Sequence, residues 1–75
     1  MTALVDLSIS GRGRVLGVQG CDEVSLRLLE MGLTPGAEVE LVGTAPLGDP
    51  LELEVRGYRL SLRRAEAARV EITPL

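Results

Sequence analysis

The residue types that usually carry catalysis or metal binding are scarce in this chain. It has no histidine, and its single cysteine is Cys21. Zinc, haem and iron–sulfur frameworks need several such ligands, and a cysteine nucleophile needs a nearby base. The eight glutamates alternate with apolar residues and lack the spacing of a calcium loop. We therefore expect no catalytic residue, no cofactor and no metal site, and interpret Cys21 as a small residue ahead of a helix.

The charged side chains favour a protein partner over nucleic acid. Eight arginines are set against eleven acidic residues, so the net charge is −3, whereas nucleic acid usually selects a basic protein. A local basic face could still form from five arginines in the C-terminal third, namely Arg56, Arg59, Arg63, Arg64 and Arg69. Only Tyr58 could stack on a base, and strand alternation predicts that it points inward. We favour pairing of these arginines with strand glutamates.

Six residues that neither the core nor the turns explain are the candidates for a partner-binding surface. Leu26 and Leu29 flank the expected buried stripe of a helix, and Leu47 lies in a loop with no strand partner to bury it. Leucines exposed near one another would form an apolar patch suited to a partner. The second group is a charged edge before the last strand and comprises Arg63, Arg64 and Glu66. Ordinary burial and a solvated turn are the alternatives for the two groups.

A short helix must position the first two leucines. Asp22 is a good N-cap, and Glu23 follows in the first turn, where the helix dipole favours negative charge. Apolar residues then recur at helical spacing, at Val24, Leu28 and Met31.

The sequence also predicts where this helix ends. Gly32 can adopt the left-handed conformation, and Leu33 would fold back on Leu28 in a Schellman motif. The segment Thr34-Pro35-Gly36-Ala37 follows and predicts a type II turn.

The remaining elements are expected to be strands. Residues 1–10 read as a loosely packed lead-in and residues 11–13 as a turn, before a strand at 14–18 that Gly17 bends. Apolar and polar residues alternate over 37–41, 51–55 and 58–62, which predicts a three-stranded meander. A helical turn at 64–68 and a strand at 70–72 follow. In the last hairpin, Arg59 could lie opposite Glu54 or Arg56, and we favour Glu54 because opposite charges stabilise a cross-strand pair.

This order predicts a mostly β fold. About five short strands, with one short α-helix between the first and second, favour a small bent barrel over an open sheet. A lone cysteine and no evident signal peptide suggest a reducing cytoplasm. The apolar stretches are too short for a spanning helix, so we expect no direct membrane insertion.

The segment LRLLEMGLTPG at residues 26–36 resembles FeoA, the ferrous iron transport protein A of bacteria. Three further segments carry the resemblance in the same order, namely APLGDP at 45–50, VRGY at 55–58 and LSLRRAEA at 60–67. The resemblance implies one SH3-like domain over residues 1–75, with its core at about 13–72. It also implies a non-enzymatic, cytoplasmic accessory role in ferrous iron uptake, through the membrane transporter FeoB or its cytoplasmic GTPase domain.

The chain is also similar to the C-terminal domain of DtxR-type metal-dependent repressors. The alternative function is therefore a stand-alone metal-regulator module that contacts a DNA-binding regulator. In those repressors the domain follows a helix-turn-helix, and we expect none here because the chain begins at Met1. Weak self-association through exposed leucines is a third hypothesis. Proline-rich peptides are not expected as ligands, because SH3 domains bind them in aromatic grooves.

Overall fold

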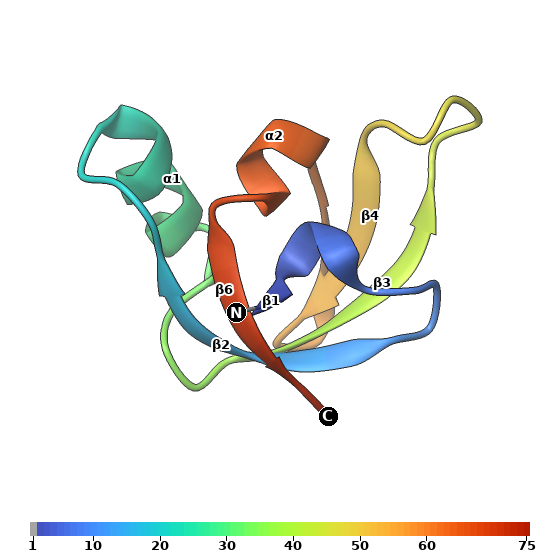
Figure 1. Ribbon diagram of the computed structural model, residues 1–75, viewed down its shortest axis with the longest axis horizontal. Helices are drawn as coiled ribbons and strands as arrows, with labels where there is room; N and C mark the ends of the chain where they lie inside the picture. Colours follow the sequence, from blue (N-terminus) through green and yellow to red (C-terminus); the bar gives the residue numbers. More distant parts are fainter. Residues whose placement is uncertain (1) are drawn as a thin grey trace.

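One antiparallel sheet curls around a single apolar core in the computed structural model, which describes residues 2–75 (Figure 1). Within that range the sheet has six strands in the order β1-β6-β2-β3-β4-β5. The elements in chain order are β1 (Thr2–Ala3), a 3-10 turn η1 (Leu4–Asp6), β2 (Arg12–Val18), α1 (Glu23–Glu30), β3 (Glu38–Thr44), β4 (Leu51–Val55), β5 (Tyr58–Leu62), α2 (Arg64–Ala67) and β6 (Val70–Pro74). The mostly β barrel and its helix between two strands are confirmed.

The N-terminal segment differs from the expectation of a loosely packed lead-in. Residue 1 lies outside the described residues, but β1 pairs with β6 and adds a sixth strand to the five expected. This pairing carries Leu4 into the core, where it is fully buried. The expected turn at 11–13 lies earlier, with the Gly11 amide donating to the Ser8 carbonyl at 2.8 Å. Arg12 and Gly13 consequently belong to β2.

Helix α1 begins and ends as its sequence predicts. The Asp22 carboxylate accepts a hydrogen bond from the Ser25 amide at 3.1 Å, which caps the first turn. At the other end the Leu33 amide donates to the Leu28 carbonyl at 3.2 Å, and the Gly32 amide donates to the Leu29 carbonyl at 3.0 Å. Gly32 has a φ of 107°, so the Schellman motif is confirmed.

The turn and strand registers also follow the sequence. The Ala37 amide donates to the Thr34 carbonyl at 3.0 Å, as the type II turn requires. Glu54 lies opposite Arg59 across β4 and β5, with a carboxylate–guanidinium distance of 3.9 Å. The register between β2 and β6 shifts between Val15 and Gly17, and the bend was expected at Gly17.

The alternating apolar residues of the meander line the core, with one exception. The buried apolar residues are Leu4, Val15, Leu28, Leu33, Ala37, Val39, Leu41, Leu51, Leu53, Val55, Leu62, Ala67, Val70 and Ile72. Tyr58 was predicted to point inward, and this is wrong, since 46% of its surface is exposed. It lies at the first position of β5, and its hydroxyl reaches the Met31 carbonyl at the end of α1.

Three connected elements gather at one end of the barrel (Figure 1). Helix α2 lies between α1 and the loop that joins β3 to β4, and the C-terminus emerges at the opposite end. All six candidate partner-binding residues belong to these three elements or to the residue just before α2.

Candidate partner-binding surface

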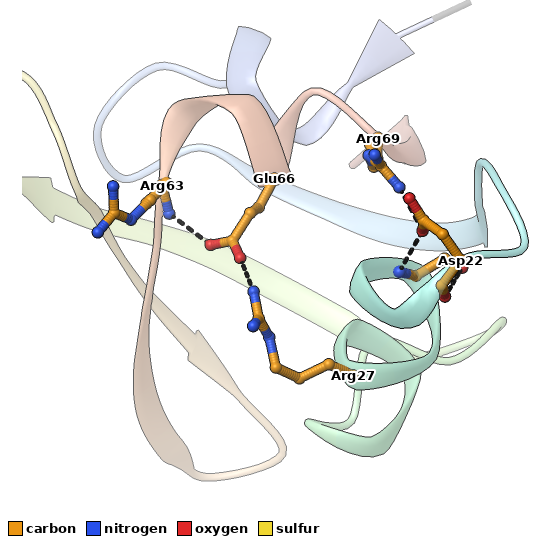
Figure 2. Close-up of polar contacts among 6 residues, drawn as sticks. Asp22, Arg27, Arg63, Glu66 and Arg69 are labelled. Carbon is orange, nitrogen blue, oxygen red and sulfur yellow. Dashed lines mark hydrogen bonds and ion pairs between the residues drawn. The ribbon is translucent and has the colours of Figure 1, made fainter.

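A carboxylate links the two helices (Figure 2). Glu66 of α2 forms an ion pair with Arg27 of α1. Its other carboxylate oxygen accepts a hydrogen bond from the Arg63 amide at 3.0 Å and so caps α2. Glu66 is only partly exposed, and its contacts give it a structural function at the junction of the helices.

A second ion pair fixes the start of α1. The Arg69 guanidinium, just before β6, donates to the Asp22 carboxylate at 2.6 Å (Figure 2). This hydrogen bond, together with that from the Ser25 amide, lowers the pKa of Asp22 from 3.8 to about 2. The same pairing raises the pKa of Arg69 above its ordinary value. Both ends of the contact are thus charged at any physiological pH.

The β3–β4 loop is braced from within and from α2. The Gly48 amide donates to the Ala45 carbonyl at 2.7 Å, and the Ala45 amide donates to the Pro50 carbonyl at 3.0 Å. From α2, the Arg64 amide donates to the Asp49 carboxylate at 3.1 Å, and the Arg64 guanidinium donates to the Gly48 carbonyl at 3.3 Å. The loop is therefore a defined turn rather than a free segment.

Leu47 sits at the tip of this turn and is almost fully in solvent. Leu47 is 98% exposed, so the fold gives this leucine almost no packing contact. The Arg64 contacts hold the loop in the conformation that exposes Leu47.

The exposed side of α1 forms a shallow groove of about 620 Å³. Leu26 is 58% exposed and Leu29 is half-buried, so of the two leucines that flank the buried stripe, Leu26 is the more open to solvent. The groove is lined by Gly20, Cys21, Asp22, Glu23, Ser25, Leu26 and Leu29. A smaller hollow of about 470 Å³ adjoins it on the Arg69 side and shares Gly20, Cys21 and Asp22.

The structure does not place the three candidate leucines in one patch. Leu26 and Leu29 belong to α1, whereas Leu47 belongs to the loop on the other side of α2 (Figure 1). Arg63 and Arg64 lie on the loop side of α2, and Glu66 lies on the α1 side. There are thus two apolar features joined by a charged helix.

Several contacts of this surface could not be predicted from the sequence. Arg27, Asp49 and Arg69 each contact a residue at least 15 positions away along the chain. Local spacing rules cannot find such partners, because they compare residues within one turn or one hairpin. Among the polar contacts that join these elements, the N-cap function of Asp22 was the one that the sequence predicted.

Within residues 2–75, no three histidine, cysteine, aspartate or glutamate side chains lie close enough to hold a metal ion together. The helices in the same range are too short or too polar to cross a bilayer.

Comparisons with known proteins identify close relatives. The FeoA domain family matches residues 2–74. Over 69 residues the chain is 35% identical to an Fe(2+) transport protein A/Fe(2+) transporter FeoB fusion protein of Porphyromonas gingivalis, covering 92% of the chain but only 8% of that protein.

Solved structures agree with this match. A FeoA-like protein of Clostridium acetobutylicum is 36% identical, with a TM-score of 0.91, and the match covers 100% of this chain and 91% of the relative. The zinc complex of Stenotrophomonas maltophilia FeoA, described as an SH3 domain protein, is 34% identical, with a TM-score of 0.87 and coverage of 97% and 91%. A manganese-dependent transcriptional repressor has a TM-score of 0.88 at 12% identity over 99% of this chain and 36% of its own, which shows a shared fold alone.

Proposed function

Because the chain belongs to the FeoA family, we propose that it is a cytoplasmic accessory protein of ferrous iron uptake that binds the transporter FeoB. The observation that carries the proposal is the Porphyromonas gingivalis fusion, in which a segment 35% identical to this chain shares one polypeptide with FeoB. Fusion keeps two modules at a high effective concentration, as expected for modules that work together. The cytoplasmic GTPase domain is the part of FeoB that we propose as the partner.

We further propose that the chain acts by binding and catalyses no reaction. The Stenotrophomonas maltophilia relative is suggested to be a ferrous iron transport activating factor, a role that needs only a docking surface. Such a surface is available where the groove of α1 and the braced loop present leucines around a charged helix. Interfaces commonly combine apolar anchors with arginine.

The six candidate residues divide into two groups within this proposal. Leu26, Leu29, Leu47 and Arg63 would touch the partner, since Leu29 is partly exposed and the other three are exposed. Arg64 and Glu66 would position them, because Arg64 holds the loop and Glu66 holds α1 against α2.

Direct binding tests the proposal. The purified chain should bind the cytoplasmic domain of FeoB from the same bacterium in titration calorimetry. Leu26→Asp should weaken that binding at least about tenfold, because an apolar anchor is replaced by a charge that must be desolvated. Leu75→Asp is the matched control, since Leu75 is also exposed but lies at the opposite end of the barrel.

Iron uptake provides the second readout. Deletion of the gene in a strain that depends on FeoB should lower ferrous iron uptake, and the wild-type gene should restore it. Unchanged uptake after deletion, together with no binding in calorimetry, would show that the chain is not an accessory of this transporter.

The alternative function as a metal-regulator module that binds a DNA-binding regulator has the shared repressor fold in its favour. It predicts a response of the chain to metal. Calorimetric titration with Fe²⁺ separates the two functions, since the transporter accessory needs no tight iron site of its own.

A further inference from the structure

The sheet ends in a strand whose outer side has no neighbour. Strand β5 pairs with β4 along its whole length, and within residues 2–75 no strand pairs with its other side. The opposite edge of the sheet, β1, has only two residues. Edge strands are commonly blunted by a proline or a bulge, but β5 contains no proline and its pairing with β4 shows no register shift. An additional strand could therefore pair with β5.

The β4–β5 turn determines which backbone groups face this edge. Arg56 and Gly57 both have a positive φ, of 52° and 85°, as a type I′ turn in a two-residue hairpin loop requires. Val55 and Tyr58 flank this turn and lie opposite each other. In such a hairpin these flanking residues exchange hydrogen bonds, and this fixes the pattern of bonding along the rest of the ladder.

Two residues of β5 direct their backbone groups away from β4. Bonding alternates along an antiparallel strand, so Leu60 and Leu62 bond to β4, whereas the amides and carbonyls of Arg59 and Ser61 point outward. Both residues are exposed, and no hydrogen bond within residues 2–75 uses these four groups. Unpaired groups of this kind bind an extended segment in β-strand addition.

The ends of β5 limit the length of a segment that could be added. At one end the strand meets its tight turn. At the other end the Arg63 amide donates to the Glu66 carboxylate, and the Arg63 carbonyl accepts from the Glu66 and Ala67 amides at 2.9 Å, because the chain enters α2 there. The accessible edge is thus the five residues of β5.

The charges of β5 select an acidic segment. The strand contains an arginine and no acidic residue. The Arg59 side chain is 66% exposed and has Glu54 on its β4 side, at a distance of 3.9 Å, while its other side is the unpaired edge. A carboxylate directly opposite Arg59 on an added strand would stabilise the pair, as opposite charges do across a ladder.

The next two positions also constrain the added segment. Glu52 lies opposite Ser61 across β4 and β5, and a second carboxylate beyond Ser61 would have no cation between it and Glu52. A small neutral side chain suits this position. Leu60 is half-buried and lines a hollow of about 120 Å³ with Glu52, Arg59 and Ser61. An apolar side chain opposite Leu60 would cover its exposed part.

We propose that an extended segment of a partner protein adds to β5 as an antiparallel strand, with a carboxylate opposite Arg59, an apolar side chain opposite Leu60 and a small neutral one opposite Ser61. This edge is distinct from the leucine surface, and the inference does not rest on FeoB being the partner. The calorimetric titration with FeoB and the peptide experiments below can therefore succeed or fail independently.

A short peptide tests the contact directly. Acetylated and amidated Val-Thr-Val-Glu-Val places its threonine opposite Ser61 and its glutamate opposite Arg59 when it runs antiparallel to β5. In NMR titrations of the isotope-labelled chain, the amide resonances of Arg59 and Ser61 should shift, and hydrogen exchange at these two amides should slow. Replacement of the glutamate by lysine should weaken binding about threefold or more, because Arg59 then faces a like charge.

Two N-methylated peptides separate backbone pairing from side-chain contact. Methylation of the threonine and glutamate amides removes the donors that face Arg59 and Ser61 and should abolish binding. Methylation of the central valine amide, which faces away from β5, should leave binding nearly unchanged. Both peptides keep the same side chains and are tested on the unaltered protein.

Ser61→Pro tests the same edge from the side of the protein. Proline is tolerated in an edge strand where the missing N–H faces outward, so the variant should keep its fold in circular dichroism and lose peptide binding. Ser61→Ala is the matched control, since it retains the amide and should bind like the wild type. Equal binding by the wild type and Ser61→Pro, equal binding of the two methylated peptides, or unshifted Arg59 and Ser61 amides at about 5 mM peptide would each overturn the proposal.

Discussion

The Asp22 carboxylate accepts hydrogen bonds from two groups, and these bonds lower its pKa. Its carboxylate caps α1 through the Ser25 amide and also accepts the Arg69 guanidinium, which lies 47 positions further along the chain. Both donors favour the ionised form, and the pKa falls to about 2 although the group is open to solvent. One exposed side chain thereby joins the start of α1 to the segment before β6.

The lowered pKa predicts a defined pH dependence. Because the folded state holds Asp22 ionised, its contribution is complete above the ordinary pKa of 3.8 and is lost as pH falls towards about 2. Asp22→Asn keeps a capping side chain but removes the charge that pairs with Arg69. The variant should therefore have a lower urea midpoint than the wild type near neutral pH, and the difference should disappear at about pH 2.

The matched control for this experiment is Glu52→Gln, which removes one carboxylate from the exposed face of β4. Its difference from the wild type should be smaller near neutral pH. A difference for Asp22→Asn that stays constant from about pH 7 to about pH 2 would show that the charge of Asp22 does not stabilise the fold.

At the scale of elements, the β4–β5 turn holds the end of α1. The Tyr58 hydroxyl donates to the Met31 carbonyl, and the Arg56 guanidinium donates to the Thr34 hydroxyl at 2.7 Å. Helix carbonyls left unpaired at a C-terminus need such donors. The hairpin and the Schellman ending therefore form one unit, and Gly32 lies at its centre.

Gly32→Ala should disrupt this unit. Gly32 has a φ of 107°, and a Cβ at this position would overlap the Tyr58 hydroxyl. The backbone strain alone costs about 1–3 kcal/mol of unfolding free energy, and displacement of Tyr58 adds to it. Urea denaturation followed by circular dichroism measures the loss.

Gly36→Ala separates the two causes. Gly36 also has a positive φ, of 91°, but no heavy atom lies within 4 Å of a Cβ built there. It should show the strain without the overlap and lose less stability than Gly32→Ala. Equal losses in the two variants would mean that the Tyr58 contact contributes nothing.

The same region shows which features a sequence can predict. The cap at Asp22, the Schellman motif at Gly32 and the Glu54–Arg59 register follow from rules that compare residues within one turn or one hairpin, and all three are confirmed. Tyr58 was misplaced because alternation assigns it to the apolar face and ignores its position at the end of a strand. The separation of Leu26 and Leu29 from Leu47 by α2 could not be predicted either, because it depends on how elements distant in the sequence pack.

At the scale of the whole molecule, the first residues complete the barrel. The pairing of Thr2 with Ile72 adds β1 beside β6, and η1 then places Leu4 under the sheet. A chain of 75 residues has a total stability of about 4–11 kcal/mol and buries a comparatively small core. Each fully buried leucine therefore contributes a substantial share of the stability, and this includes Leu4 at the fourth position.

Leu4→Ala should consequently destabilise the whole domain. Leu4 has no exposed surface, and truncation of a buried leucine to alanine costs about 2–5 kcal/mol through lost burial and the cavity that remains. Equilibrium urea unfolding gives the loss directly, provided that the slope of the transition is unchanged. Leu75→Ala is the control at the other terminus, because Leu75 is exposed while its amide still donates to the Arg12 carbonyl, and it should change stability by about 0.5 kcal/mol or less. A similarly small change for Leu4→Ala would mean that the barrel is stable without its N-terminal strand. That result would agree with the sequence-based prediction that residues 1–10 pack loosely.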